Sequence, residues 1–87
     1  MPNKLTDADY EIEAISKGLL ILDVLIEERF VLEKRIVEKT RLSRDTVMRS
    51  LRTLRLRGYA DRNARREWFV GPGFVTLAMK IARRQGL

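Results

Sequence analysis

The chain has 87 residues, of which 45% are hydrophobic, and it carries a formal net charge of +6. A chain of this length buries one compact core, so we expect a single domain over residues 1–87. The absence of cysteine and histidine excludes disulfide scaffolds and zinc–thiolate or thiol chemistry, and is typical of a small cytoplasmic protein. Residues 1–10 lack the apolar run and cleavage site of a signal peptide, and we expect a flexible segment there.

The charge is divided unevenly along the chain. Residues 1–40 hold six Lys and Arg against nine Asp and Glu, whereas residues 41–87 hold twelve against three. A basic half in a small domain indicates a polyanionic partner, most often nucleic acid, and the alternative is a basic surface without a ligand. The longest apolar run, residues 19–22, is far too short to span a bilayer, so we expect no membrane partner.

The first predicted helix covers residues 11–28 and is apolar on more than one side. One stripe at helical spacing consists of Ile12, Ile15, Leu19, Leu22 and Ile26. Further apolar residues, at positions 20, 21, 24 and 25, lie on other faces. Two interpretations remain open: a homodimer contact through the second face, or a central helix covered entirely by its own domain.

A second helix is predicted over residues 31–40, with Leu32, Ile36 and Val37 facing inward. After a turn, Ser43 is placed to cap a third helix, which runs from Arg44 to about Arg57 and stops at Gly58.

Two short strands follow, residues 59–62 and 67–70, around a polar turn at residues 63–66. A last helix is predicted over residues 74–84, with Phe74, Leu77, Ala78 and Ile81 on the side that would cover the core. The fold class we expect is mainly α with a small β-hairpin: a winged helix-turn-helix with a three-helix core, a two-stranded wing and a C-terminal helix.

The third helix combines an apolar side with a basic one. Residues 40–58 contain six arginines and one acid, and Val47, Leu51 and Leu54 lie on one arc of the helix. A helix that packs on the core with one side and bears guanidinium and hydroxyl groups on the other suits the major groove of double-stranded DNA. The candidate DNA-binding residues of helix 44–57 and its cap are Ser43, Arg44, Asp45, Thr46, Arg49, Ser50, Arg52 and Thr53.

The predicted hairpin places further cations at its tip, residues 62–66. We expect Arg62, Arg65 and Arg66 to contact the phosphate backbone or the minor groove, while Trp68 belongs to the core. The alternative is a structural hairpin whose tip remains in solvent.

The motifs, in this order, resemble the N-terminal winged helix-turn-helix domain of isocitrate-lyase-regulator (IclR) type bacterial transcription regulators. Residues 17–22 (KGLLIL) resemble the family's first-helix segment, residues 42–49 (LSRDTVMR) its turn and recognition-helix start, and residues 68–72 (WFVGP) the end of its wing. Thr46 and Arg49 match the family's Thr-x-x-Arg, and Leu54 with Gly58-Tyr59 matches its Leu-x-x-x-Gly-Tyr. The resemblance runs from about Ile15 to Leu77.

This resemblance implies a sequence-specific regulator in the bacterial cytoplasm or nucleoid that binds double-stranded DNA as a homodimer, through the first helix, the last helix or both. Arg41 stands where the family usually has Gly, and Ser50 where it prefers Leu. The family's C-terminal effector domain has no counterpart in the sequence. We therefore expect no small-molecule effector, and a stand-alone regulator of phage or mobile-element type.

The sequence also bears on two other functional classes. A winged-helix adaptor in a replication, transposition or transcription complex is supported by Leu56, which projects from the outer side of the third helix unless it packs beneath the wing. We expect no enzyme, because the sequence contains no His or Cys, no phosphate-binding glycine loop and no metal-ligand cluster. No cofactor or metal is expected.

Overall fold

The computed structural model describes residues 5–86, so the first four residues of the segment expected to be flexible lie outside the described part of the chain. The rest of that segment contains a 3-10 helix, η1 (Asp7–Tyr10). The backbone N–H of Thr6 donates to Asp9 Oδ2 at 2.7 Å, and this bond lowers the pKa of the Asp9 carboxyl below its usual value.

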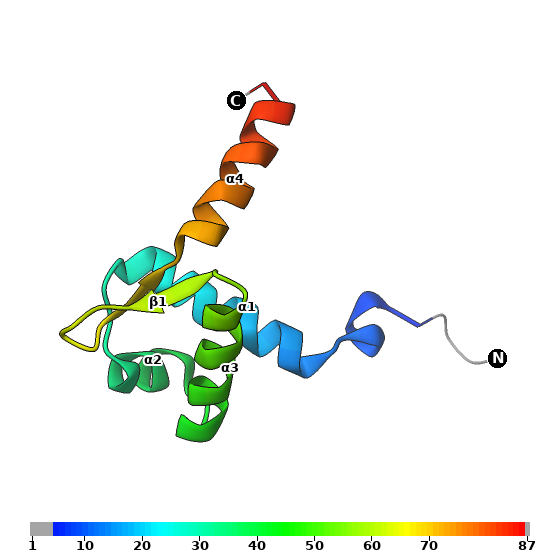
Figure 1. Cartoon of the computed structure of the whole chain (residues 1–87). Coiled ribbons are helices and arrows are strands. Elements are labelled where there is room, and N and C mark those ends of the chain that lie inside the picture. The colour runs from blue at the N-terminus through cyan, green and yellow to red at the C-terminus, as the bar shows by residue number, and fades with distance from the viewer. Residues whose placement is uncertain (1–4, 87) are drawn as a thin grey trace.

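Four α-helices and a hairpin follow η1 in the predicted order. They are α1 (Glu13–Glu28), α2 (Glu33–Thr40), α3 (Arg44–Leu56), β1 (Ala60–Arg62), β2 (Trp68–Val70) and α4 (Pro72–Arg84). Figure 1 shows a body made of α1–α3 and the hairpin, from which α4 and the N-terminal segment extend in different directions. The predicted fold class, a winged helix-turn-helix, is confirmed. None of the helices within residues 5–86 is long and apolar enough to cross a membrane.

The core forms where the three helices meet the hairpin. Its fully buried side chains come from all three helices: Ile21, Leu25, Ile36, Val47 and Leu51. Leu54 packs partly against them, so the predicted core side of α3 is confirmed. The prediction for Leu32 is wrong, because this residue is 52% exposed. It has extended backbone just before α2 begins, where helical periodicity does not apply.

The hairpin is attached to the body by backbone hydrogen bonds. Ala60 pairs with Val70 and Arg62 with Trp68 in an antiparallel register. Val31, in the loop after α1, exchanges two backbone bonds with Trp68, at 3.0 and 2.7 Å. Trp68 is only 2% exposed, as predicted for a core residue. The base of the hairpin is therefore held by both strand pairing and burial.

Helix α1 has one face in the core and one in solvent. Ile21, Leu22, Val24 and Leu25 are buried, whereas the predicted stripe, apart from Leu22, is exposed. The interpretation that the domain covers this helix entirely is therefore wrong. Both faces are apolar, and the positions of α2, α3 and β2 decide which one is buried.

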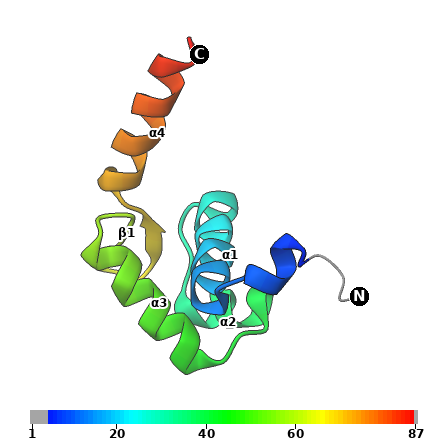
Figure 2. The same cartoon turned by 90° about the vertical axis from the view of Figure 1, so that its right-hand side faces the viewer.

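Helix α4 does not cover the core, contrary to the prediction. None of its residues is buried, and Leu77 and Ile81 are 41% and 50% exposed. Only its first turn contacts the body closely, where Phe74 packs edge-on against Tyr59 with ring centroids 6.2 Å apart. The chain leaves β2 at Gly71-Pro72, and from there the helix axis points away from the three-helix core (Figures 1 and 2).

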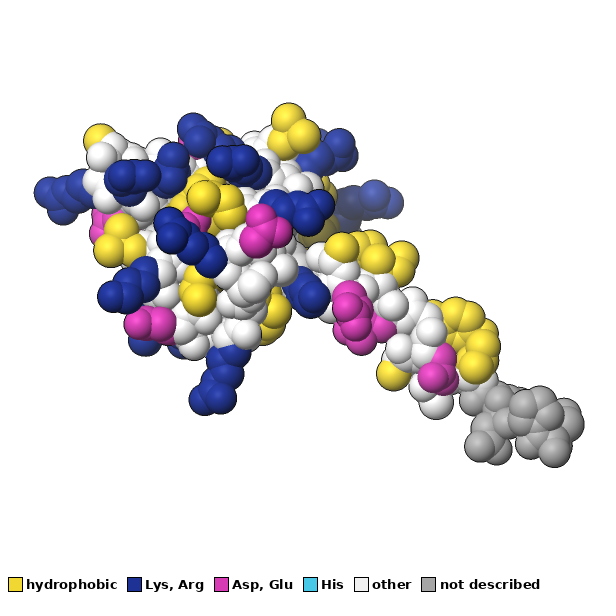
Figure 3. All heavy atoms as spheres, turned by 90° about the horizontal axis from the view of Figure 1, so that it is seen from below, with side chains coloured by type: hydrophobic (Ala, Val, Ile, Leu, Met, Phe, Trp, Pro, Cys, Tyr) yellow, Lys and Arg dark blue, Asp and Glu magenta, His cyan; other side chains and the backbone are white. Residues whose placement is uncertain are grey.

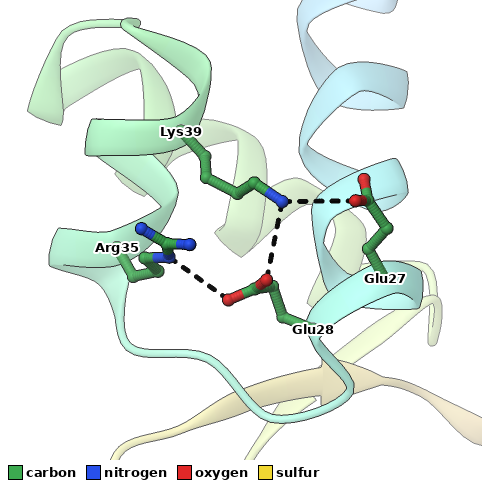
Figure 4. A network of polar contacts seen from close by, with 4 residues as sticks. All are labelled: Glu27, Glu28, Arg35 and Lys39. Atoms are coloured by element: carbon green, nitrogen blue, oxygen red, sulfur yellow. Dashed lines mark hydrogen bonds and ion pairs between the residues drawn. The ribbon is translucent and has the colours of Figure 1, made fainter.

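An ion-pair network joins the end of α1 to α2 (Figure 4). Glu28 accepts from Arg35 at 3.2 Å and lies 3.5 Å from Lys39, which also contacts Glu27 at 3.3 Å. The hydrogen bond from Arg35 lowers the pKa of the Glu28 carboxyl. These surface pairs connect α2 to α1, in addition to the buried contacts that Ile36 makes in the core.

Candidate nucleic-acid interface

Helix α3 presents a polar, cationic side to solvent. Val47 and Leu51 are 0% exposed on the core side, whereas the Arg49 side chain on the opposite side is 79% exposed. Arg52 and Thr53 are exposed as well, and Thr46 and Ser50 are half-buried at the edges of this surface. The burial of these two aliphatic residues thus orients the guanidinium groups outward. Figure 2 shows α3 along one outer side of the body, with α1 and α2 beside it.

The start of α3 is capped as predicted. The Oγ atom of Ser43 accepts from the backbone N–H of Thr46 at 3.1 Å, and its own hydroxyl donates to Thr46 Oγ1 at 2.9 Å. The first amides of a helix lack intrahelical acceptors, and the helix dipole favours an anion at this end. The capped N-terminus is therefore suited to a phosphate group.

In the turn before α3, Arg41 adopts the left-handed backbone conformation that glycine usually supplies. Arg41 has φ of 59° and ψ of 18°, and its N–H donates to the carbonyl of Val37 at 2.9 Å. This is the usual way to end a helix, at the steric cost of a side chain in place of a hydrogen. The substitution of Arg for the expected Gly therefore leaves the turn intact and adds an exposed cation beside α3.

The arginines of α3 differ in their ionic partners. Three of them contact carboxylates: Arg44 with Glu33 at 3.6 Å, Arg49 with Asp45 at 3.8 Å, and Arg55 with Asp61 at 3.3 Å. Exposed pairs of this kind contribute little to stability, so a phosphate could replace the carboxylate. Within residues 5–86, the arginines without an ion-pair partner or an aromatic contact are Arg41, Arg52, Arg57, Arg65, Arg66, Arg83 and Arg84.

The wing tip is organised by Asn63. Its Oδ1 accepts from the backbone N–H groups of Arg65 and Glu67, at 2.9 and 3.0 Å. Arg66 has a left-handed backbone with φ of 66°, and its N–H donates to the carbonyl of Asn63 at 3.0 Å. The side chains of Arg65 and Arg66 are exposed at this ordered tip. The sequence analysis assigns no role to Asn63, although an asparagine at the start of a turn is a known signal for this geometry.

Arg62, the third predicted wing cation, has a different environment. Its guanidinium carbon lies 5.1 Å from the centre of the Trp68 ring, and the residue is half-buried. Stacking on an aromatic face leaves the charge intact but fixes the side chain along the hairpin. The structure thus brings Arg65 and Arg66 to the tip and holds Arg62 at its base.

Many cationic side chains lie on one face of the body (Figure 3). Dark blue Lys and Arg side chains gather on the face shown in Figure 3, while the projecting N-terminal segment carries acidic and hydrophobic ones. Strand β1 contacts α3, so the wing and the helix belong to one body. Residues 5–86 contain no cluster of three or more carboxylates that could hold a metal ion. The arrangement can bind an extended polyanion.

Solved structures with the same arrangement were found. An IclR transcriptional regulator from Alicyclobacillus acidocaldarius matches with a TM-score of 0.78 and 22% identity over 84% of this chain. An IclR-family regulator from Brucella abortus matches with 0.72 and 24% over 80%, and one from a Rhodococcus species with 0.74 and 21% over 95%. The chain shares its fold with IclR-type transcriptional regulators. The resemblance expected from its motifs is thereby confirmed.

The IclR-type fold accounts for only part of those proteins. The chain spans about 30% of the Alicyclobacillus regulator, 28% of the Brucella one and 33% of the Rhodococcus one. The sequence matches no protein-family model and has no significant match among curated proteins.

Proposed function

We propose that this chain is a sequence-specific double-stranded DNA-binding protein that regulates transcription. The observation that carries the proposal is the outward-facing side of α3, where Arg49, Arg52 and Thr53 are exposed directly opposite the buried Val47 and Leu51. An α-helix of this shape fits the major groove, and arginine is the side chain that most often reads guanine there. The shared fold with IclR-type transcriptional regulators supports the same function.

In this mechanism, α3 and the wing have different tasks. Arg49, near the middle of α3, reads base edges, and Thr53 contacts a base edge or a phosphate. The capped N-terminus with Ser43 and Thr46 binds one phosphate, and Arg44 and Arg52 bind others along the groove. Asp45 pairs with Arg49 at 3.8 Å, and because both side chains are exposed the pair is weak enough for a base edge to replace it. Ser50, half-buried, lies at the edge of the contact.

The wing supplies contacts that do not depend on sequence. Arg65 and Arg66 reach the phosphate backbone or the minor groove beside α3, because the Asn63 turn holds them at the tip. Arg62 flanks them from its place on Trp68 and contributes mainly through its field. Together these charges make binding dependent on salt, with a slope of about −0.9 in log K against log salt concentration for each phosphate neutralised.

Selection from a pool of random duplexes, followed by sequencing, tests the proposal. A recovered motif would support readout by α3, and two inverted copies of it would support a homodimer. Recovery of unrelated sequences, with the same affinity for every duplex, would contradict sequence-specific binding. Affinity measured between low and physiological salt then gives the number of phosphate contacts.

A second candidate function is an interaction adaptor, which one observation favours. Leu56 at the end of α3 is 84% exposed, so it does not pack beneath the wing. An apolar side chain among arginines suits a protein surface as well as a thymine methyl group. Negligible affinity for duplex DNA at low salt, together with loss of a protein partner in Leu56→Glu, would favour the adaptor.

A further inference from the structure

Leu56 is the most exposed of the large apolar side chains within residues 5–86, at 84%. A single exposed leucine is ordinary on a protein surface, so its exposure alone indicates nothing. Its position on α3 is more informative. Leu56 follows Arg49 by seven residues, and seven residues of an α-helix return to within about 20° of the same direction. Leu56 therefore lies on the same side of α3 as Arg49, two turns further along, on the surface proposed to enter the major groove.

Thr53 adds a second apolar group beside Leu56. Its hydroxyl donates to the backbone carbonyl of Arg49 at 2.9 Å. The hydroxyl and the methyl group leave Cβ in different directions, so the methyl group, Cγ2, is turned away from this bond. Residues three apart are neighbours on a helix surface, and Thr53 and Leu56 are both exposed. The side chain of Leu56 and Cγ2 of Thr53 together form the apolar edge of α3.

The C-terminal turn of α3 fixes the position of this edge. The backbone N–H of Tyr59 donates to the carbonyl of Leu54 at 2.8 Å. The N–H of Gly58, whose φ is 79°, donates to the carbonyl of Arg55 at 3.0 Å, which completes a Schellman motif. The Arg55 guanidinium also pairs with a carboxylate of β1 at 3.3 Å, and Figure 2 shows this end of α3 beside the hairpin. The backbone that carries Leu56 is therefore in place before DNA binds, and little order has to be gained on binding.

The surroundings of the apolar edge are cationic. Arg52 and Arg49, one and two turns before Leu56, are exposed, as are Arg55 and Arg57 on either side of it in the chain. Protein-docking surfaces are marked by contiguous apolar patches, whereas the exposed side of α3 offers only Leu56 and one methyl group. In the major groove, by contrast, phosphates flank the bases, and the 5-methyl group of thymine is the apolar group that a base pair presents. The cationic setting therefore favours a base edge over a protein as the partner of Leu56.

The length of helix between the two residues sets the distance between their base pairs. An α-helix rises 1.5 Å per residue, so Leu56 lies about 10 Å beyond Arg49 along the axis of α3. Successive base pairs of double-stranded DNA are about 3.4 Å apart. When α3 lies along the groove, Leu56 reaches a base pair about three steps from the one that Arg49 contacts.

We propose that the apolar edge of α3 recognises the 5-methyl group of a thymine, about three base pairs from the pair that Arg49 reads. The proposal rests on the proposed function, because it requires α3 in the major groove of DNA. It adds a base, a position in the site and two residues that select it. It also requires α3 to lie along the groove over its whole length, so that its last turn contacts DNA as well as its first.

Deoxyuridine tests the contact, because it differs from thymidine only in lacking the 5-methyl group. Each thymine of the site recovered from random duplexes is replaced in turn, and affinity is measured by fluorescence titration. For the wild-type chain, one replacement should weaken binding about fourfold, the effect of one buried methyl group. That thymine should lie about three base pairs from the position at which Arg49→Ala relaxes the preference. A site in which no thymine responds would overturn the proposal.

Leu56→Asn keeps a similar volume but places an amide at the apolar edge. This variant should bind the thymine and uracil duplexes with equal affinity, and it should bind unrelated duplexes as the wild type does, because its phosphate contacts are unchanged. Leu32→Asn, at an exposed leucine outside α3, is the matched control and should keep the full preference for thymine. Unchanged circular dichroism shows that each variant folds. A full preference for thymine in Leu56→Asn would overturn the proposal.

Two variants of Thr53 separate its methyl group from its hydroxyl. Thr53→Val keeps the methyl group and removes the hydroxyl, whereas Thr53→Ser does the reverse. Thr53→Val should retain the preference for thymine over uracil, and Thr53→Ser should reduce it. The opposite order would mean that the hydroxyl contacts the base, which would overturn the apolar edge.

Cytosine and 5-methylcytosine separate the methyl group from the rest of thymine. At the position that responds to uracil, 5-methylcytosine should bind about fourfold more tightly than cytosine, because its methyl group lies at the same place in the groove. Equal affinities for the two would overturn the proposal.

The outcomes also distinguish this proposal from the proposed function. A recovered motif without a methyl-sensitive thymine would overturn the contact of the apolar edge and leave sequence-specific binding intact. Failure to recover any motif would overturn both. Leu56→Asn that keeps its affinity for the recovered site and loses a protein partner would overturn the contact in favour of the adaptor.

Discussion

Asn63 and Glu67 are joined by three hydrogen bonds across the wing turn. The backbone N–H of Asn63 donates to the Glu67 carbonyl at 2.9 Å, the Glu67 N–H donates to Asn63 Oδ1 at 3.0 Å, and Asn63 Nδ2 donates to Glu67 Oε1 at 3.0 Å. A turn that places two arginines side by side is thereby closed by an amide and a carboxylate, and the acid is engaged at the base of the turn.

Asn63→Ala removes the acceptor of two backbone amides. We expect a loss of about 1–2 kcal/mol in the free energy of unfolding, and DNA affinity reduced to a similar extent for every sequence, because the wing makes sequence-independent contacts. Urea unfolding and fluorescence titration with several duplexes measure the two effects. Glu67→Gln, which keeps an oxygen for Asn63 Nδ2, is the control and should retain wild-type affinity or exceed it. A sequence-dependent loss in Asn63→Ala would contradict the role of the wing.

Arg49→Ala and Arg65→Ala should change DNA binding in different ways. Removing Arg49 should cost about 1–3 kcal/mol on the selected site and relax the preference at one base position. Removing Arg65 should weaken all duplexes about equally and reduce the salt slope by about one phosphate. Titrations of both variants on matched and mismatched duplexes check this. Unchanged affinity in both would refute the assigned roles.

Leu51→Ala and Leu56→Ala compare two leucines of the same helix. Leu51 is 0% exposed and Leu56 is 84% exposed. Truncating the buried residue should cost about 2–5 kcal/mol, through lost burial and a cavity, whereas the exposed one should change stability by less than about 0.5 kcal/mol. Thermal and urea unfolding measure the difference. Equal effects would mean that α3 is rotated from the position described.

Ser43→Ala removes the cap of α3. The N–H of Thr46 loses its acceptor at 3.1 Å, and we expect a loss of about 1 kcal/mol in the free energy of unfolding. Ser43→Asp should retain the cap and most of the stability but weaken DNA binding, because its charge repels the phosphate that this end of the helix binds. DNA affinity in Ser43→Asp equal to that of the wild type would argue against a phosphate at this position.

Lowering the pH should reduce the stability of the folded chain, because protonation of Glu28 weakens the contact between α1 and α2. Its pKa in the folded chain is lowered from the ordinary 4.5 by the hydrogen bond from Arg35. The unfolded chain therefore takes up this proton at a higher pH than the folded chain does. The stabilisation is present above the ordinary pKa and is lost as the pH falls through the lowered one. Urea unfolding at a series of pH values from neutral into the acid range should show the loss, and Glu28→Gln should show less of it.

The sequence by itself determined the elements and the outward face of α3. Val47, Leu51 and Leu54 recur at helical spacing, Ser43 and Gly58 bound the helix, and two short strand-like segments flank the polar turn at residues 63–66. These are local signals, because capping, periodicity and turn chemistry depend on residues a few positions apart. They sufficed to predict the winged helix-turn-helix and the exposure of Arg49, Arg65 and Arg66, but not the packing of Arg62 on Trp68.

Only the tertiary structure decided which apolar surfaces are buried. Helix α1 has two apolar faces and α4 has one, and periodicity does not indicate which of them meets another element. The structure buries Ile21 and Leu25 and leaves Ile15 and Ile81 in solvent, because α2, α3 and the hairpin pack on one face of α1 and α4 leaves the body at Gly71. Burial depends on contacts between segments far apart in the chain, and those contacts exist only once the chain has folded.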